Sequence, residues 1–266
     1  MPSNVRFSNS SGVALVGCVF SSLGAGALQF TGGGQDHLVS GCSFSDISGA
    51  AIQLGDYDTA GIVDAELQIR NNNIEDNFIT NVAAEFRGAC GIQVGYSAYT
   101  TIKHNTLSDL PYSGISIGWG WGTSDPSYAE FNVVAGNEVS DFKLVLEDGG
   151  GIYALSAQPG SVISRNWLYN MGKGAGGGAY YPDEGSAYWK VEENVFSNSS
   201  FCSDDCEWLH VWINSIHDIE VKDNYVDTGT MVNNGVDVDV VGTVLVEDGD
   251  WPDEAVKIMD EAGVRG

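Results

Sequence analysis

The chain has 266 residues, of which 43% are hydrophobic, and this is enough apolar material to bury a substantial core. Its 36 acidic and 11 basic residues give a formal net charge of −25, which argues against binding to nucleic acid or anionic membranes, since both depend on Lys and Arg. No apolar run approaches the roughly 20 residues of a transmembrane helix. The first residues form no signal peptide, yet the acidic composition favours an extracellular or low-pH setting.

Eight short turn sequences recur along the chain, each with an Asn or Cys followed one or two residues later by an apolar residue. These positions lie 24 to 35 residues apart: Cys18, Cys42, Asn77, Asn105, Asn137, Asn166, Asn194 and Asn224. A repeat of this length, built from short β-type segments separated by Gly, Asn, Asp and Ser, is typical of a parallel β-solenoid. We therefore expect an all-β, single-domain solenoid of about eight coils.

The recurring Asn has a physical role in such a fold. An amide side chain both donates and accepts, so Asn residues stacked in adjacent coils hydrogen bond along a ladder that leaves neither group unpaired. We expect Cys18 and Cys42 to continue this ladder in the first two coils as small apolar side chains.

A second set of repeats predicts one strand in each coil. The apolar strands are expected at 27–30, 51–54, 91–94, 114–117, 151–154, 179–181 and 209–212. Because side chains alternate between the two faces of a strand, one file forms the core: Leu28, Ile52, Ile92, Ile115 and Ile152. Their neighbours should form an outward column, with Ala179 aligned to Ile152: Gln29, Gln53, Gln93, Ser116, Tyr153, Tyr180 and His210.

The two ends of the chain differ. Residues 1–246 are predicted to form the solenoid, and residues 247–266 a C-terminal capping segment with a short helix at 253–262, for which Asp250 is the expected N-cap. Residues 4–20 already look like a coil without a cap. Because an uncovered coil offers backbone groups and apolar surface, we expect either preceding sequence or end-to-end pairing of two copies there.

The five cysteines are compatible with export. Cys202 and Cys206 bracket a polar loop, where a short disulfide is expected and two free thiols are the alternative. Cys18 and Cys42 either bridge or fill space, and Cys90 is expected in the core.

Two tryptophans follow the strand at 114–117. Trp119 and Trp121 lie between glycines and share a face if the segment is extended. Sugar rings stack on aromatic faces, so the pair predicts a saccharide platform, and the alternative is a small packed cluster over a turn.

Acidic residues flank the outward column on two successive coils. Asp148 precedes the strand of Tyr153, while Asp183 and Glu184 follow the strand of Tyr180. Hydrolysis of a glycosidic bond requires two carboxyl groups, one to protonate the leaving oxygen and one as nucleophile or base. The alternative is that Asp-Gly and Asp-Glu-Gly are ordinary turn sequences.

The Asn repeat, the coil length and the G-I-x-x strands resemble the pectate lyase-like right-handed parallel β-helix superfamily over essentially the whole chain. Within it, D-x-G-x-I-Y from Asp148 to Tyr153 and Y-x-D-[DE]-G-S from Tyr181 to Ser186 resemble glycoside hydrolases with fucosidase- and xylanase-type members. The resemblance implies that Asp148 and Asp183 are the catalytic pair, and we add Glu184 beside them. The expected substrate-binding residues are Trp119, Trp121, Tyr153, Tyr180, Tyr181, His210 and Gln93.

Two other functions remain open. A polysaccharide lyase would use a basic residue near the acids, together with calcium held by acids such as Asp56, Asp58, Asp204 or Asp205. This surface would repel an anionic pectin, so we rank a hydrolase on a neutral or weakly charged polysaccharide first, with no cofactor required. A catalytically silent carbohydrate-binding or virulence-type β-helix is the third reading.

Overall fold

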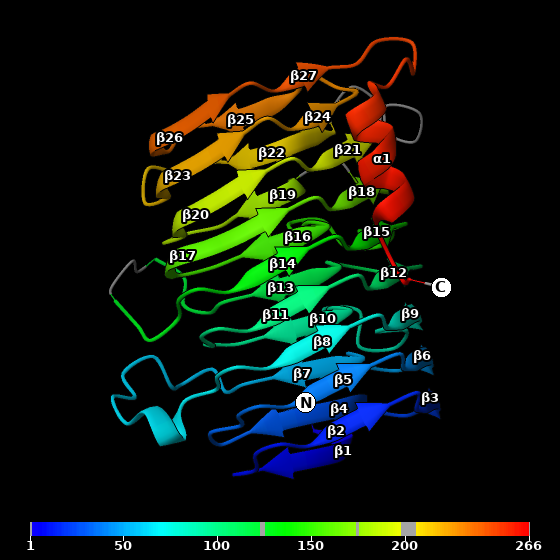
Figure 1. Cartoon of the computed structure of the whole chain (residues 1–266), viewed down its shortest axis with the longest axis vertical. Helices are drawn as coiled ribbons and strands as arrows, with labels where there is room; N and C mark the ends of the chain where they lie inside the picture. The colour runs from blue at the N-terminus through cyan, green and yellow to red at the C-terminus, as the bar shows by residue number, and fades with distance from the viewer. Residues whose placement is uncertain (1, 123–125, 174–175, 198–205, 266) are drawn as a thin grey trace.

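The computed structural model describes residues 2–122, 126–173, 176–197 and 206–265. Their strands stack into three parallel sheets of nine strands each, so that every coil contributes one strand to each sheet (Figure 1). This confirms the predicted parallel β-helix.

The first sheet carries the outward column of the sequence prediction. Its strands are β1 (Ser3–Ser8), β4 (Gly26–Thr31), β7 (Ile52–Leu54), β10 (Ile92–Val94), β13 (Ile115–Ile117), β16 (Ile152–Ala154), β19 (Gly178–Pro182), β22 (Glu207–Val211) and β25 (Met231–Asn233).

The second sheet follows the first in every coil. Its strands are β2 (Ala14–Val16), β5 (Leu38–Ser40), β8 (Asn73–Glu75), β11 (Thr101–Lys103), β14 (Val133–Ala135), β17 (Ala157–Ser164), β20 (Ala187–Glu192), β23 (His217–Lys222) and β26 (Val236–Val241).

The third sheet completes each coil. Its strands are β3 (Val19–Leu23), β6 (Ser43–Ile47), β9 (Phe78–Val82), β12 (Thr106–Ser108), β15 (Glu138–Ser140), β18 (Trp167–Tyr169), β21 (Val195–Ser197), β24 (Tyr225–Val226) and β27 (Val244–Leu245).

The described residues form nine coils, close to the predicted number of about eight, and the additional coil is the last one, which lacks the Asn used to count coils. Tyr225 pairs with Val244, which places Thr243 opposite Asn224 in the stack. The predicted core file is confirmed: Leu28, Ile52, Ile92, Ile115 and Ile152 pair in sequence on adjacent strands, and none is exposed to solvent.

The asparagines form a continuous chain of hydrogen bonds at the turn between the second and third sheets. Asn105 Nδ2 donates to Asn137 Oδ1 and Asn137 Nδ2 to Asn166 Oδ1, both at 2.9 Å, and the same contacts run from Asn77 to Asn224. Each Oδ1 also accepts from a backbone N–H of the preceding coil, which fixes the coils in register. Cys18 and Cys42 are free thiols and do not bridge.

The C-terminal helix α1 (Asp253–Glu261) lies against the outside of the third sheet, beside β18 and β21, rather than across the last coil (Figure 1). Its buried Ala255 and Ile258 pack on Val195, and Arg165 pairs with Glu254 and Glu261 at 3.2 and 3.1 Å. The N-cap is Pro252 and not Asp250. Within the described ranges, no helix is long and apolar enough to span a bilayer.

Candidate active site

Two long turns project from the same edge of the solenoid, one after β7 with the short helix η1 (Ala65–Leu67) and one after β13 (Figure 1). They meet through aromatic side chains. Tyr57 of the first turn lies 4.2 Å from Trp119 of the second, and Trp119 lies 4.6 Å from Trp121, measured between ring centroids. Gly118 allows this turn, since it has a φ of +97° and a Cβ there would lie 2.0 Å from the Leu155 carbonyl oxygen.

The carboxylate of Asp183 is the centre of the site. Its Oδ2 accepts from the Tyr153 hydroxyl and from Trp121 Nε1 at 3.1 Å, and its Oδ1 accepts from Trp212 Nε1 at 2.8 Å and the Tyr181 hydroxyl at 3.2 Å. Asp183 is 5% exposed. Four donors on two oxygens suit a carboxylate that carries no proton, because a carboxylic acid would have to place its own O–H against one of them.

Asp148 lies on the neighbouring coil and is exposed. Its backbone carbonyl accepts from the Tyr112 hydroxyl, while its Oδ1 accepts from the Tyr181 hydroxyl at 3.3 Å. The glycines that follow Asp148 let the coils approach closely, since a Cβ on Gly150 would lie 2.8 Å from the Gly178 carbonyl oxygen of the next coil. The D-x-G-x-I-Y motif thus places an exposed acid at the start of a strand packed tightly against its neighbours.

One hydroxyl group joins the two acids. Tyr181 lies within hydrogen-bonding distance of both Asp148 and Asp183, yet it has a single proton to donate. Burial raises the pKa of Tyr181 and of Tyr153, and the adjacent Asp183 strengthens both shifts. The two phenols therefore stay protonated and act as donors to the carboxylate.

The prediction for Tyr180 was wrong by one residue of register. Ile152 pairs with Tyr180 and Tyr153 pairs with Tyr181, so Tyr181 continues the outward column and Tyr180 points into the core with no exposed surface. Alignment on the small residue Ala179 predicts the opposite register, but the core position at this coil holds the ring of Tyr180. A shift of one residue moves every side chain to the other face.

This register predicts opposite outcomes for two neighbouring Tyr→Phe changes. The Tyr180 hydroxyl has no hydrogen-bond partner among the described residues, so Tyr180→Phe should keep or raise stability, by up to about 1 kcal/mol. Tyr181→Phe removes the hydroxyl shared by the acids and should lower any glycan-cleaving activity of the chain by about 10-fold or more at unchanged fold. Urea unfolding and initial rates on both variants measure this, and equal loss of activity in the two would contradict the assignment.

The coil after β19 adds three polar residues to the site. Trp212 follows β22 and donates to Asp183, although no sequence motif assigns it a role. His210 packs edge-on against Tyr181, with ring centroids 4.8 Å apart, and its Nδ1 hydrogen bonds to Glu207 Oε2. Glu207 and Tyr57 were missed, because neither belongs to a motif and only the stacking of coils brings them to the site.

The remaining predicted residues lie at the margin. Glu184 is half-buried beside the turn of Trp121, since a Cβ on Gly122 would lie 3.4 Å from Glu184 Oε2. Gln93 is on the outward column but two strands away from Tyr153. The structure therefore gathers Asp148 and Asp183 with the predicted aromatic residues other than Tyr180, has Glu184 at the edge of this group, and leaves Gln93 apart.

One basic residue close enough to Asp148 to feel its charge is buried. Lys143 has no exposed surface, and its Nζ donates to the Gly176 carbonyl oxygen at 3.1 Å. Burial lowers the pKa of Lys143 to about 8, while Asp148, Glu207 and Glu147 oppose that shift. A lysine without surface cannot reach a substrate proton, which disfavours Lys143 as the base of a lyase.

Calcium was the ion expected for a lyase. Within the described ranges, no group of three or more His, Cys, Asp or Glu side chains is arranged to hold a metal ion. Of the acids predicted as calcium ligands, Asp56 accepts from the Gly32 backbone N–H at 2.7 Å. Asp204 and Asp205 lie outside the described residues, as does Cys202, although Cys206 is disulfide-bonded.

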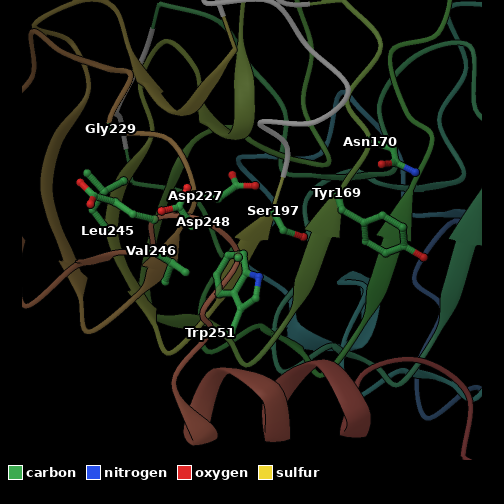
Figure 2. Close-up of a pocket in the computed structure, with 11 residues that line it drawn as sticks. Tyr169, Asn170, Ser197, Asp227, Gly229, Leu245, Val246, Asp248 and Trp251 are labelled. Atoms are coloured by element: carbon green, nitrogen blue, oxygen red, sulfur yellow. The ribbon is translucent and has the colours of Figure 1, made fainter.

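A cavity of about 880 Å³ lies elsewhere, between the ends of β18 and β21 and the segment leading into α1 (Figure 2). Tyr169, Asp227 and Trp251 are in its lining, together with Asp248 and Ser197, and none of the predicted site residues is. We place the candidate site at Asp148 and Asp183 instead, because one hydroxyl lies within hydrogen-bonding distance of both acids there, beside the aromatic rings and the two sequence motifs, whereas no sequence motif points to the lining of the cavity.

Comparisons with known proteins agree with the fold. Residues 3–249 match the family model described as the right handed beta helix region. A solved structure named "Glycoside hydrolase" superposes with a TM-score of 0.73 at 23% identity, covering 98% of this chain and 40% of that one. The chain thus spans less than half the length of that structure, and at this identity the likeness shows the fold alone. No curated protein matches the sequence.

Proposed function

Because the chain belongs to the right-handed β-helix family, we propose that it is a carbohydrate-active enzyme of this fold, a glycoside hydrolase that acts on a polysaccharide outside the cell. One observation carries the proposal: Asp148 and Asp183 from adjacent coils share the hydroxyl of Tyr181 beside an exposed tryptophan. Two further findings support it, namely the superposition on a glycoside hydrolase and the disulfide of Cys206, a bond typical of exported proteins.

In the proposed reaction the two acids have different roles. Asp183, held by three donors of its own and by the shared Tyr181 hydroxyl, attacks the anomeric carbon. Asp148, which is exposed and whose side chain is near that hydroxyl, gives its proton to the leaving oxygen as the glycosidic bond breaks. Water then attacks the glycosyl-enzyme ester, Asp148 takes the proton of that water, and the carboxylate of Asp183 is released. Tyr181 shifts its hydrogen bond toward whichever acid carries the charge.

The spacing of the acids predicts the stereochemistry. Since the Tyr181 hydroxyl oxygen lies 3.3 Å from Asp148 Oδ1 and 3.2 Å from Asp183 Oδ1, the two carboxyl oxygens are no more than about 6.5 Å apart. Retaining enzymes have carboxyl groups about 5 to 5.5 Å apart and inverting enzymes about 6.5 to 9.5 Å, to admit a water. We expect retention, which proton NMR of the first product anomer measures. An inverted anomer would mean that a water lies between the acids.

The test of the function is a panel of neutral, acidic and amino-sugar polysaccharides at pH 4 to 7, with and without calcium. New reducing ends without absorbance from unsaturated products are the expected result for a hydrolase. Unsaturated products lost with a chelator would instead show a lyase, and binding without any cleavage over days would show a silent carbohydrate-binding protein. Either of these two outcomes overturns the proposal.

A further inference from the structure

The two projecting turns form one continuous ledge beside the acid pair. Besides the Tyr57 and Trp119 contact, Tyr128 of the second turn hydrogen bonds to Thr59 of the first, and its hydroxyl donates to the Tyr96 carbonyl oxygen at 2.8 Å. These contacts bridge segments almost 70 residues apart in the sequence, and they hold the aromatic rings as a unit. We call Tyr57, Trp119 and Trp121 the aromatic ledge.

The ledge exposes its aromatic surface next to the acids. Trp121 is 50% exposed, although its Nε1 donates to Tyr153 and to Asp183. These hydrogen bonds fix the edge of the ring at the carboxylate and leave part of the ring accessible to solvent. Trp119 and Tyr57 are each partly exposed and continue the surface away from Asp183. An exposed ring fixed by hydrogen bonds loses little conformational entropy when a ligand stacks on it.

The direction of the ledge follows from the topology. Tyr57 follows β7 and Asp183 follows β19, and β10, β13 and β16 lie between these strands in the first sheet. The ring contacts give the length of this path: Tyr57 to Trp119 is 4.2 Å and Trp119 to Trp121 is 4.6 Å between centroids, and Trp121 Nε1 lies 3.1 Å from Asp183 Oδ2. The Tyr57 ring is therefore at most about 14 Å from Asp183, or about three strand spacings. An extended glycan advances by a length close to one strand spacing per pyranose ring, so the ledge and the acids together match about three sugars.

The acids lie at one end of the aromatic ledge, and surface that could bind a sugar continues past them on the next coil. His210 and Trp212 belong to the next coil, so surface for a sugar exists on both sides of Asp183. Trp121, on the near side of Asp183, is 50% exposed, and Trp212, on the far side, is 38% exposed. An open face flanked on both sides suits binding in the middle of a chain, whereas a closed pocket suits its end.

We propose that the aromatic ledge is a binding subsite for an extended polysaccharide chain, which lies along the solenoid axis over Tyr57, Trp119 and Trp121 and is cleaved at internal bonds by the acid pair. This inference rests on the proposed function for the cleavage step alone. Binding along the ledge is a separate property that can be measured without turnover.

The experiment compares oligosaccharides of two to six sugars, with xylo-oligosaccharides as the probe, on the full chain. We expect kcat/KM, or Kd by calorimetry where no cleavage is seen, to improve at least about 10-fold between two and four or five sugars. Trp119→Ala should remove that gain, so that the value for five sugars falls toward the value for two. Tyr57→Leu, on the other turn, should have the same effect even if Trp119→Ala folds poorly.

The matched control is Phe78→Ala, which removes an exposed aromatic ring on β9 of the third sheet and should leave the length dependence unchanged. Equal values for all chain lengths, or equal losses for short and long substrates in Trp119→Ala, would overturn the ledge. Length-dependent binding without reducing ends would keep the ledge and overturn the hydrolase, while cleavage without length dependence would do the reverse.

Discussion

Asp183→Asn is expected to lower the rate of glycoside cleavage by roughly 10⁴-fold or more, since loss of a nucleophile removes the covalent step itself. The same change should lower stability by about 1 to 3 kcal/mol, because the new amide N–H₂ must face two of the four donors that now bond the carboxylate. Initial rates and urea unfolding of the purified variant give both values.

Asp148→Asn is the matched control for the stability effect. Asp148 is exposed and accepts one side-chain hydrogen bond, so the change should cost stability less than about 0.5 kcal/mol while it also lowers the rate. A large loss of stability in Asp148→Asn would show a turn acid. Unchanged activity in Asp183→Asn would remove Asp183 from the reaction altogether.

Rescue of activity by azide distinguishes the nucleophile from the acid and base when either Asp is replaced by Gly. If Asp183 is the nucleophile, azide should restore cleavage by Asp183→Gly and give a glycosyl azide of inverted configuration, because the anion attacks in place of the carboxylate. If Asp148 is the acid and base, azide should restore Asp148→Gly with retention, since it attacks the intermediate held by Asp183. The reverse pattern would exchange the two roles.

The parallel β-helix could be predicted because every coil buries a polar side chain at the same turn and must satisfy its hydrogen bonds. A buried amide at the same turn needs a neighbour of its own kind, so the Asn spacing shows the coil length directly. The last coil was missed for the same reason, because Thr243 takes the Asn position there. The path of α1 along the third sheet was not predictable, since Arg165 meets Glu254 and Glu261 through side chains about 90 residues apart.

The site was less predictable than the fold, because it depends on which side chains meet across coils. The two acid motifs singled out Asp148 and Asp183, and both side chains lie within hydrogen-bonding distance of the Tyr181 hydroxyl. The strand of Tyr180 and Tyr181 has two tyrosines in a row, and alternation alone does not say which one faces the core. Tyr57 lies in a turn and Glu207 at the start of β22, and no motif marks either residue, so only the three-dimensional contacts identify them.

Asn166→Ala should lower the free energy of unfolding by about 3 to 5 kcal/mol, a large share of the roughly 5 to 15 kcal/mol typical of a domain. The side chain makes four hydrogen bonds: Nδ2 to the Val134 carbonyl oxygen and to Asn194 Oδ1, and Oδ1 from the backbone and side-chain N–H groups of Asn137. The change leaves the Asn137 N–H buried without its acceptor, where water cannot replace it.

The matched control is Asn73→Ala, since Asn73 is exposed on β8 and should cost less than about 0.5 kcal/mol. Because each coil contacts only its neighbours, Asn166→Ala should also destabilise the coils of Asn137 and Asn194. The double variant Asn166→Ala with Asn137→Ala should therefore lose less free energy of unfolding than the sum of the two single variants. Asn166 stands in the coil of Tyr153, and a shift in that coil would misalign Tyr153 with Tyr181. Additive losses, or a loss as small as that of Asn73→Ala, would mean that strand pairing alone fixes the register of the site.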